Sequence, residues 1–191
     1  MLTVMNSKKV YQWLEKIDKE LAAQAGAAAC EHCGGTLHRG NYQRKPRGGV
    51  AVVVECWDRR YSFCCSQEGC RKRKTPPSVR FLGRKVYAGV VVVLVAAMMH
   101  GPSARRAAQL HDALGIDIRT LKRWRQWWLD FFVCTPFWKA GRGRFMPVLD
   151  EGQMPFCLVQ AFGGDDRTGV IKLMEFLAPI STGTWKEVVA M

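Results

Sequence analysis

No apolar stretch of this sequence is long enough to cross a membrane. Residues 86–99 are apolar apart from the phenol of Tyr87, but the run has only fourteen residues, and a membrane span needs about 20. Arg84 and Lys85 close the run on one side, and His100 closes it on the other. We therefore expect a buried core helix there and no membrane partner.

Acidic residues are also scarce. The chain has 16 Asp and Glu against 29 Lys and Arg, which gives a net charge of +13 and a pI near 9.7. The excess is +9 in residues 30–85 and +6 in residues 102–145, whereas residues 146–191 carry −3. Basic blocks of this kind attract polyanions by counterion release, so nucleic acid is the leading class of partner.

A secretory signal is missing as well, because Asn6, Ser7, Lys8 and Lys9 stand where a signal peptide needs an apolar core. We expect a protein of the reducing cytoplasm, associated with the nucleoid, in which clustered cysteines serve as metal ligands before disulfides. The sequence also has no phosphate-binding loop and no nucleophile–base motif. We therefore expect no enzymatic activity.

The residue patterns predict an α+β chain of four parts. Residues 1–29 form an amphipathic helix and linker, and residues 30–84 form a small β module of the four-cysteine zinc-ribbon type. Residues 85–135 form a mostly helical helix-turn-helix module, and residues 136–191 are a partly helical tail suited to protein interaction.

In the first part, apolar side chains recur at helical spacing over residues 6–26, with Asn6 as the expected N-cap. The predicted inner face, which should pack on a neighbouring module or a partner subunit, carries Val10, Trp13, Leu14, Ile17 and Leu21. Residues 22–29 are rich in Ala and Gly and are predicted to form a short linker.

The second part has strand-like composition in three segments, residues 36–42, 50–57 and 61–65. A basic, glycine-rich loop is expected over residues 39–49. Shorter apolar segments recur in the tail, over Phe156 to Phe162 and Val170 to Leu177.

Two cysteine pairs flank the β-rich stretch. Cys30 and Cys33 precede two glycines, and Cys65 and Cys70 follow after a gap that lets the chain run out along one strand and return along another. This arrangement brings both pairs around one tetrahedral Zn²⁺, and four thiolates leave no open catalytic position. Residues 30–85 also hold too little apolar material for a core that is stable without a metal.

Other residues compete for these ligand positions. Cys64 adjoins Cys65, but Phe63 supplies the aromatic-x-Cys lead-in of many zinc ribbons, which favours Cys65. Redox chemistry is disfavoured because no βαβ pattern surrounds the C-x-x-C motif. Three further residues are reserve ligands: Cys56, His32 and His38. Two other cysteines, Cys134 and Cys157, are expected to be ordinary buried thiols.

Two helices joined by a short turn are predicted after the apolar run. Ser103 caps a helix over residues 103–114, which Gly115 ends. Asp117 then caps a helix over residues 118–132. The turn between the two helices has the length found in helix-turn-helix modules.

The 100° step per residue divides the helix over residues 118–132 into two faces. The apolar face should bury against the preceding helices and carries Leu121, Trp124, Trp128, Phe131 and Phe132. The opposite face carries side chains that reach bases or phosphates, namely Arg119, Lys122, Arg123 and Gln126. No carboxylate interrupts this face before Asp130, whereas a solvated face normally mixes both signs. The pattern predicts a recognition helix.

Further basic residues complete the expected contacts with nucleic acid. They form a tract just upstream of the module and a pair on its first helix: Arg71, Lys72, Arg73, Lys74, Arg105 and Arg106.

The order of these modules resembles the DNA-binding regions of bacterial insertion-sequence proteins. The resemblance spans roughly residues 30–132 and is carried by CEHCGG at residues 30–35, RRYSFCC at residues 59–65 and LGIDIRTLKRWRQWW at residues 114–128. It implies binding to the terminal inverted repeats of double-stranded DNA, either within a transposase or as a separate small protein that guides or represses one.

The resemblance does not supply a catalytic domain, because a domain with three metal-binding carboxylates needs more than about 100 residues. Residues 133–191 are too short, and their acids are expected to be solvated loop residues: Asp150, Glu151, Asp165, Asp166 and Glu175. We therefore expect an accessory or regulatory factor of a transposable element. Its expected partners are a separately encoded transposase or recombinase and a second copy of the chain.

Three other functions fit the same residues. A transcriptional regulator would use the same physics at another operon. An RNA-binding or ribonucleoprotein module would use the basic loop and the tryptophans for stacking. A protein-interaction adaptor would use the acidic tail and the N-terminal helix.

Overall fold

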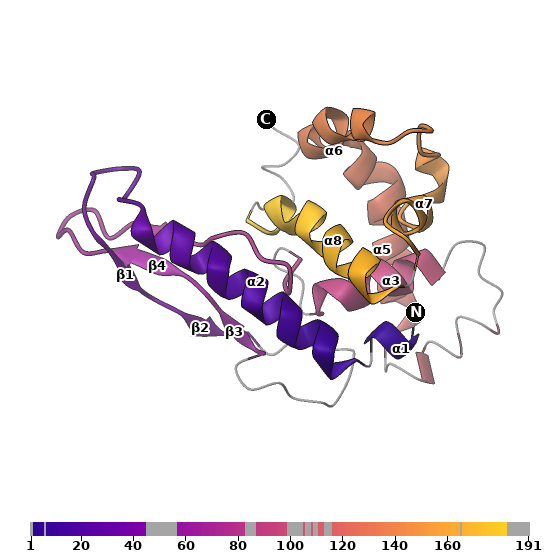
Figure 1. The fold of residues 1–191 in the computed structure, drawn as a ribbon, viewed down its shortest axis with the longest axis horizontal. Coiled ribbons are helices and arrows are strands. Elements are labelled where there is room, and N and C mark those ends of the chain that lie inside the picture. Colours follow the sequence, from indigo (N-terminus) through magenta and orange to yellow (C-terminus); the bar gives the residue numbers. More distant parts are fainter. Residues whose placement is uncertain are drawn as a thin grey trace.

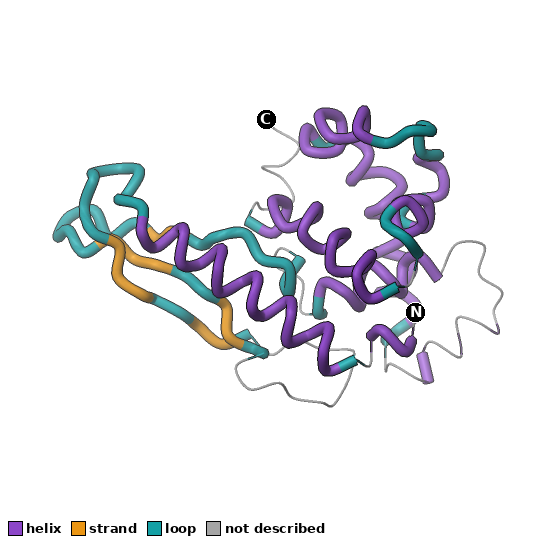
Figure 2. Tube along the Cα trace, in the orientation of Figure 1, coloured by secondary structure: helices purple, strands orange, loops and turns teal. Residues whose placement is uncertain are grey.

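The computed structural model describes residues 2–5, 7–44, 57–82, 87–98, 116–164 and 166–182, together with positions 105, 108, 111 and 112. Short strands gather at one end of the molecule and helices at the other (Figures 1 and 2). The chain is thus mixed α+β. Residues 30–44 and 57–75 are called the cysteine module below, and residues 87–98 and 116–182 the helical region.

One long helix, α2 (Lys8–Ala27), joins these two parts, preceded by the short α1 (Leu2–Met5). Its buried side recurs at helical spacing through Val10, Leu14, Asp18 and Ala22. Two sequence predictions are wrong here. The segment 22–29 is helical as far as Ala27, because alanine favours helix over linker.

The second correction concerns the face of α2. Trp13, predicted to be buried, is 49 % exposed, whereas Tyr11 and Glu15 are buried beside Val10 and Leu14. The inner face is therefore rotated relative to the prediction, toward the side that carries Asp18. The predicted N-cap Asn6 lies outside the described residues, and Ser7 precedes the helix without a side-chain capping bond.

The cysteine module is built from two small antiparallel sheets. Its strands are β1 (Leu37–Arg39), β2 (Tyr42–Gln43), β3 (Arg59–Arg60), β4 (Phe63–Cys65) and β5 (Arg73–Lys74). One sheet has the order β1-β4-β5 and the other pairs β2 with β3. Residue pairing places Leu37 opposite Cys65 and Phe63 opposite Lys74.

The strands differ from the sequence prediction in their extent. The segment 36–42 divides into β1 and the start of β2, because the ladder is interrupted at Gly40 and Asn41. There the Gly40 amide still donates to the Ser62 carbonyl oxygen, but the Ser62 amide donates to the side chain of Asn41. β2 lies inside the predicted basic loop, and β5 lies inside the basic tract, where no strand was expected. The predicted strand over residues 50–57 falls almost entirely outside the described residues.

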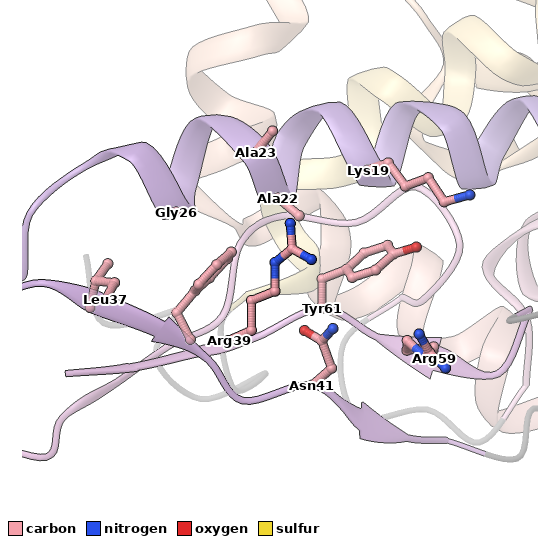
Figure 3. A pocket seen from close by; sticks show the side chains of 10 residues that line it. Lys19, Ala22, Ala23, Gly26, Leu37, Arg39, Asn41, Arg59 and Tyr61 are labelled. Carbon is pink, nitrogen blue, oxygen red and sulfur yellow. The ribbon is translucent and has the colours of Figure 1, made fainter. Parts of the chain in front are cut away.

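α2 lies across the strands of the cysteine module (Figure 3). Its Ala22 joins a small apolar cluster with Cys30, Leu37, Phe63 and Cys65. The approach is close, since a side-chain carbon added at Gly26 would meet the Phe63 ring at 2.6 Å. The N-terminal half of α2 contributes instead to the main core of the helical region, through Val10 and Leu14.

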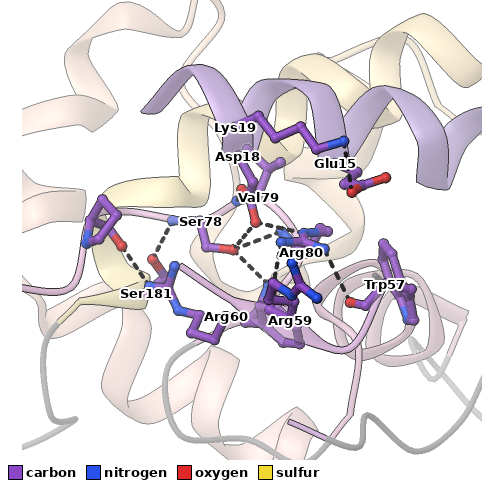
Figure 4. A network of polar contacts seen from close by, with 12 residues as sticks. Glu15, Asp18, Lys19, Trp57, Arg59, Arg60, Ser78, Val79, Arg80 and Ser181 are labelled. Atoms are coloured by element: carbon purple, nitrogen blue, oxygen red, sulfur yellow. Dashed lines mark hydrogen bonds and ion pairs between the residues drawn. The ribbon is translucent and has the colours of Figure 1, made fainter. Parts of the chain in front are cut away.

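A buried polar network fixes α2 to the segment that leaves the cysteine module (Figure 4). Asp18 is 1 % exposed and accepts three hydrogen bonds, from the Ser78 hydroxyl at 2.6 Å, the Val79 amide at 2.7 Å and the Arg80 Nε at 2.7 Å. The charge of this carboxylate is balanced by the buried guanidinium of Arg80, as a stable buried ion pair requires.

The same network reaches the other elements. Arg80 donates to the carbonyl oxygens of Trp57 at 3.1 Å and Arg59 at 2.7 Å, which holds it against the start of β3. The Ser78 amide donates to the hydroxyl of Ser181 at 2.7 Å. One buried carboxylate therefore connects α2 with both parts of the molecule.

The helical region is centred on α3 (Gly89–Met98), in which every residue from Gly89 to Ala97 is buried. α3 contacts α5, α7 and α8. The predicted core helix over residues 86–99 is thus confirmed over Gly89–Met98, whereas Ala88 pairs with Phe81 in an isolated bridge before the helix begins. Among the described residues, no helix combines the length and apolar character needed to cross a membrane.

The helix predicted over residues 118–132 is present as α5 (Ile118–Gln126), continued by a π-helical turn, η1 (Trp127–Phe131). The Asp117 side chain caps it by accepting from the Arg119 amide, as predicted. In the π turn the Phe132 amide donates to the carbonyl oxygen of Trp127, five residues back. This widening turns Phe131 outward to 53 % exposure, so its predicted burial is wrong, while Phe132 stays buried.

The rest of the helical region consists of short helices. They are η2 (Phe132–Cys134), α6 (Pro136–Gly141), η3 (Arg142–Arg144), η4 (Glu151–Gln153), α7 (Phe156–Ala161), α8 (Arg167–Leu177) and η5 (Ala178–Ser181). α7 and α8 coincide with the two apolar segments expected in the tail. Two carboxylates that were expected to be solvated loop residues have structural partners: Glu151 accepts from the Trp138 indole at 2.7 Å, and Asp166 caps α8.

The first helix of the expected helix-turn-helix, over residues 103–114, lies largely outside the described residues. Arg105 is helical and exposed, and Arg106 is outside the description. His111, further along this segment, contacts the Ile116 carbonyl oxygen through its Nδ1 at 3.0 Å.

Candidate metal centre and basic helix

The first cysteine pair sits on a tight turn before β1. The Gly34 amide donates to the Cys30 carbonyl oxygen at 2.8 Å, and the Cys30 amide donates to the Gly35 carbonyl oxygen at 2.9 Å. Gly34 has φ +72°, a left-handed conformation that favours glycine. At Gly35 a side-chain carbon would lie 3.2 Å from the Cys65 sulfur and 3.4 Å from the Cys33 sulfur. Both glycines therefore serve the turn and the space around the thiols.

The second pair sits on a wider turn between β4 and β5. The amides of Cys70 and Arg71 both donate to the Gln67 carbonyl oxygen, at 3.2 and 3.3 Å. Arg71 directly follows the second cysteine, as Gly34 does in the first turn, and it too is left-handed, with φ +43°. The two turns thus end in the same backbone conformation, although one has a glycine there and the other an arginine.

The four thiols converge on one point. The Cys33 and Cys65 sulfurs are 3.4 Å apart, the Cys30 and Cys70 sulfurs are 3.8 Å apart, and all four lie within 4.8 Å of one another. A tetrahedral centre with metal–sulfur bonds of about 2.3 Å requires sulfur separations of about 3.8 Å. The four predicted ligands are therefore brought together in a metal-binding arrangement.

Backbone amides point at each sulfur. The amide two residues further along the chain donates to each thiol: His32 to Cys30, Gly35 to Cys33, Gln67 to Cys65 and Lys72 to Cys70. Such donors stabilise thiolates, and at Cys30 they lower the thiol pKa to about 7.

The remaining three thiols respond differently. At Cys33, Cys65 and Cys70 the amide also lowers the thiol pKa, but burial and the neighbouring thiols together raise it overall. Four adjacent thiolates repel one another, and a bound cation offsets this electrostatic repulsion. The site is thus suited to hold a metal rather than four free thiolates.

The competing ligands lie elsewhere. Cys64 alternates with Cys65 along β4, so its side chain faces away from the cluster, where it contacts the Arg71 carbonyl oxygen at 3.4 Å. His32 and His38 are exposed and do not belong to the cluster, and Cys56 lies outside the described residues. Cys134 is exposed, which corrects its predicted burial, because it ends the short η2 at the surface.

The basic tract that follows Cys70 is partly occupied by contacts within the module. Arg73 donates to the Gly40 carbonyl oxygen at 3.1 Å and lies over the Tyr42 ring, and Lys74 pairs with Glu31 at 2.6 Å. The pairing with Lys74 lowers the pKa of the Glu31 carboxyl. Arg71 and Lys72 are exposed. Two of the four predicted nucleic-acid contacts therefore have structural partners as well.

The two faces of α5 separate by exposure. Leu121 and Trp124 are buried, and Trp128 follows on the same side in the π turn. The four side chains of the predicted recognition face are all exposed: Arg119, Lys122, Arg123 and Gln126. The Arg123 guanidinium donates to the Thr120 hydroxyl at 3.0 Å, which orients it on the helix surface.

Comparison of the chain with protein-family models, with curated proteins and with solved structures found no match. The functional assignment therefore depends on the residues and on their geometry. Two features carry it, which are the four-thiol cluster at one end of the molecule and the exposed cationic side of α5 at the other.

Proposed function

We propose that the cysteine module is a zinc ribbon that binds one structural Zn²⁺ through Cys30, Cys33, Cys65 and Cys70. Four sulfur donors at tetrahedral separations suit Zn²⁺ or iron, and glycines with backbone amides around the sulfurs are typical of zinc knuckles. The ligand shell is complete with four thiolates, so the metal holds the fold and takes no part in a reaction.

We propose further that the chain is a zinc-dependent, sequence-selective DNA-binding protein. The observation that carries this proposal is the exposure of Arg119, Lys122, Arg123 and Gln126 on one side of a helix whose other side is buried. Arg pairs bidentately with guanine and Gln with adenine, and each good contact discriminates between bases by about 1–3 kcal/mol. A single-sign face of this kind fits the major groove better than it fits plain solvent.

Its proposed role is that of an accessory or regulatory factor of a transposable element, acting on double-stranded DNA with a separately encoded transposase or recombinase. This role follows the resemblance of residues 30–132 to insertion-sequence proteins. A transcriptional regulator would share the same DNA contacts, and the genes beside its binding sites in a genome-wide occupancy map distinguish the two roles.

Selection of binding sites from random duplexes tests whether α5 reads the base sequence. The wild-type chain should enrich one site, and Arg123→Ala and Gln126→Ala should relax the choice of base without lowering the melting temperature. Lys139→Ala, an exposed cation on α6, is the matched control and should select the wild-type site. If the α5 variants also select the wild-type site with equal preference, α5 does not read the DNA.

Salt dependence gives a second measure. If roughly 6 phosphates are neutralised, affinity for the selected duplex should fall by about three decades between 50 and 200 mM salt. Lys122→Ala should reduce the slope by about one phosphate contact. A flat response would show that the basic residues lie away from the interface.

A further inference from the structure

A cleft lies between α2 and the strands of the cysteine module (Figure 3). Its volume is about 640 Å³, which is within the range of pockets that hold small organic ligands. It is lined from α2 by Lys19, Ala22, Ala23 and Gly26, and from the module by Leu37, Arg39, Asn41, Arg59, Tyr61 and Phe63.

The charge of the lining has one sign. Lys19, Arg39 and Arg59 line the cleft, and none of the described lining residues is a carboxylate. Lys19 pairs with Glu15 at 3.0 Å, whereas Arg39 and Arg59 form no ion pair with a described residue. In Figure 3 the Arg39 side chain extends from β1 toward α2 beside Tyr61. An anion is the ligand that this charge favours.

Buried cations behind the cleft add to the same field. Arg60, next to Arg59 on β3, is 2 % exposed and donates to the Pro76 carbonyl oxygen at 2.6 Å. Arg80 is also buried, and it lies over the Tyr61 ring at 5.2 Å. Asp18 balances Arg80, but no carboxylate makes an ion pair with Arg60 in the described part of the chain. The buried carboxylate of Asp18 therefore accompanies the two buried guanidinium groups.

The apolar part of the lining suits a flat ring. Tyr61 and Phe63 contribute aromatic side chains, and α2 presents only the small residues Ala22, Ala23 and Gly26 opposite them. Asn41 adds an amide at the edge, and its side-chain oxygen accepts from the Ser62 amide at 3.1 Å. Cations beside aromatic rings are the combination by which proteins hold unpaired nucleotides.

We propose that this cleft binds a nucleoside phosphate unit, with its phosphate at Arg39 and Arg59 and its base on the side of Tyr61, Phe63 and the small residues of α2. A duplex does not fit a cavity of this size, so the unit is unpaired, either a free nucleotide or the phosphorylated end of a single strand. This inference rests on the proposed function and extends it, because the cleft would hold a strand end while the exposed side of α5 binds the duplex.

Calorimetric titration of the full-length, zinc-loaded protein tests this inference. The titrants are adenosine monophosphate, adenosine, inorganic phosphate, and a short oligothymidylate with and without a 5′-phosphate. We expect adenosine monophosphate and the phosphorylated strand to bind at least tenfold more tightly than adenosine or phosphate alone. Preference for the strand over the free nucleotide identifies the strand end as the source, and the reverse identifies a free nucleotide.

Variants of the lining assign the binding to the cleft. Arg39→Gln combined with Arg59→Gln removes two cations of the lining, and Ala23→Phe fills the cleft from an exposed helix position without changing charge. Both variants should weaken nucleotide binding at least tenfold. Arg144→Gln combined with Arg167→Gln, two exposed cations of the helical region, is the matched control and should bind as the wild type does. Zinc content and circular dichroism confirm that each variant is folded.

The outcomes separate this inference from the proposed function. Arg123→Ala should leave nucleotide binding unchanged, and the Arg39 and Arg59 double variant should still select the wild-type duplex site. Equal affinity for inorganic phosphate and adenosine monophosphate would overturn the proposed base contacts. Absence of nucleotide binding, or wild-type binding by both cleft variants, would overturn the proposal even if duplex selection holds.

Discussion

In the cysteine module, the described buried apolar cluster is formed by Leu37, Phe63, two cysteines of the four-thiol cluster and Ala22 of α2. In the helical region, a continuous core surrounds α3 and includes the indole rings of Trp124, Trp128 and Trp138. With the proposed zinc bound, the first part depends on metal–thiolate bonds and backbone amides, and the second depends on aromatic packing. A chain of this length can therefore combine two different sources of stability, joined through α2.

Metal removal should produce the largest difference in stability between the cysteine module and the helical region. A structural zinc contributes on the order of 10 kcal/mol to folding, so a chelator, or Cys65→Ser, should unfold the cysteine module while much of the helical region remains. Circular dichroism should retain most of its helical signal, and mass spectrometry should show four additional thiols open to alkylation. Metal analysis should give one zinc per chain, and a zinc-free protein with the same protected thiols would contradict the proposal.

Removal of a core indole should have the opposite pattern. Trp128 is fully buried and contacts the rings of Trp127 and Phe132. Trp128→Ala should destabilise the helical region by about 4 kcal/mol and leave zinc affinity unchanged. Trp13→Ala, which removes a half-exposed indole, is the control and should melt like the wild type. Equal loss of zinc affinity in Trp128→Ala would show that the two parts fold as one unit.

Breaking the buried ion pair should affect both parts at once. Asp18→Ala leaves the Arg80 guanidinium buried without its carboxylate, at a cost of about 3 kcal/mol. Thermal melting and chelator sensitivity should therefore shift together. Glu20→Ala removes an exposed carboxylate from the same helix and should shift neither. A change in melting alone would mean that the network stabilises only the helical region.

The smallest expected effect distinguishes the two turns of the cysteine module. Gly34→Ala places a side chain in the left-handed region and should weaken zinc retention by about 1 kcal/mol. Arg71→Gly replaces an arginine in the left-handed conformation by glycine and should strengthen zinc retention by up to about 1 kcal/mol. Competition with a zinc-binding dye measures both. A gain from Gly34→Ala would contradict the shared geometry of the turns.

The local features of the fold and of the metal centre were predictable from the sequence. Cysteine spacing and the aromatic lead-in at Phe63 identify the ligands, because residues two apart on a strand share a face and Cys64 does not. The unbroken apolar run identifies α3, and Asp117 identifies the start of α5. Each of these signals lies within a few residues of the structure that it predicts.

Features that depend on distant residues were not predictable. The pairing of Asp18 with Arg80 spans 62 residues, and an isolated charge normally indicates a solvated position. The outward turn of Phe131 follows from a single π-helical turn that breaks the 100° step. The cleft needs three separate segments to meet, and no spacing in the sequence indicates that Arg39 and Arg59 face α2.

Because α2 precedes the segments that it packs against, its contacts form in a fixed order during synthesis. Asp18 leaves the ribosome 62 residues before Arg80, which is a delay of about 3–12 s at the usual 5–20 residues per second. The contact of α2 with α8 follows only later, because α8 begins at Arg167, a further 87 residues after Arg80. During that interval Asp18 lacks its buried partner, and Val10 and Leu14 are exposed. The nascent chain therefore presents an apolar helix face that chaperones and neighbouring chains can bind.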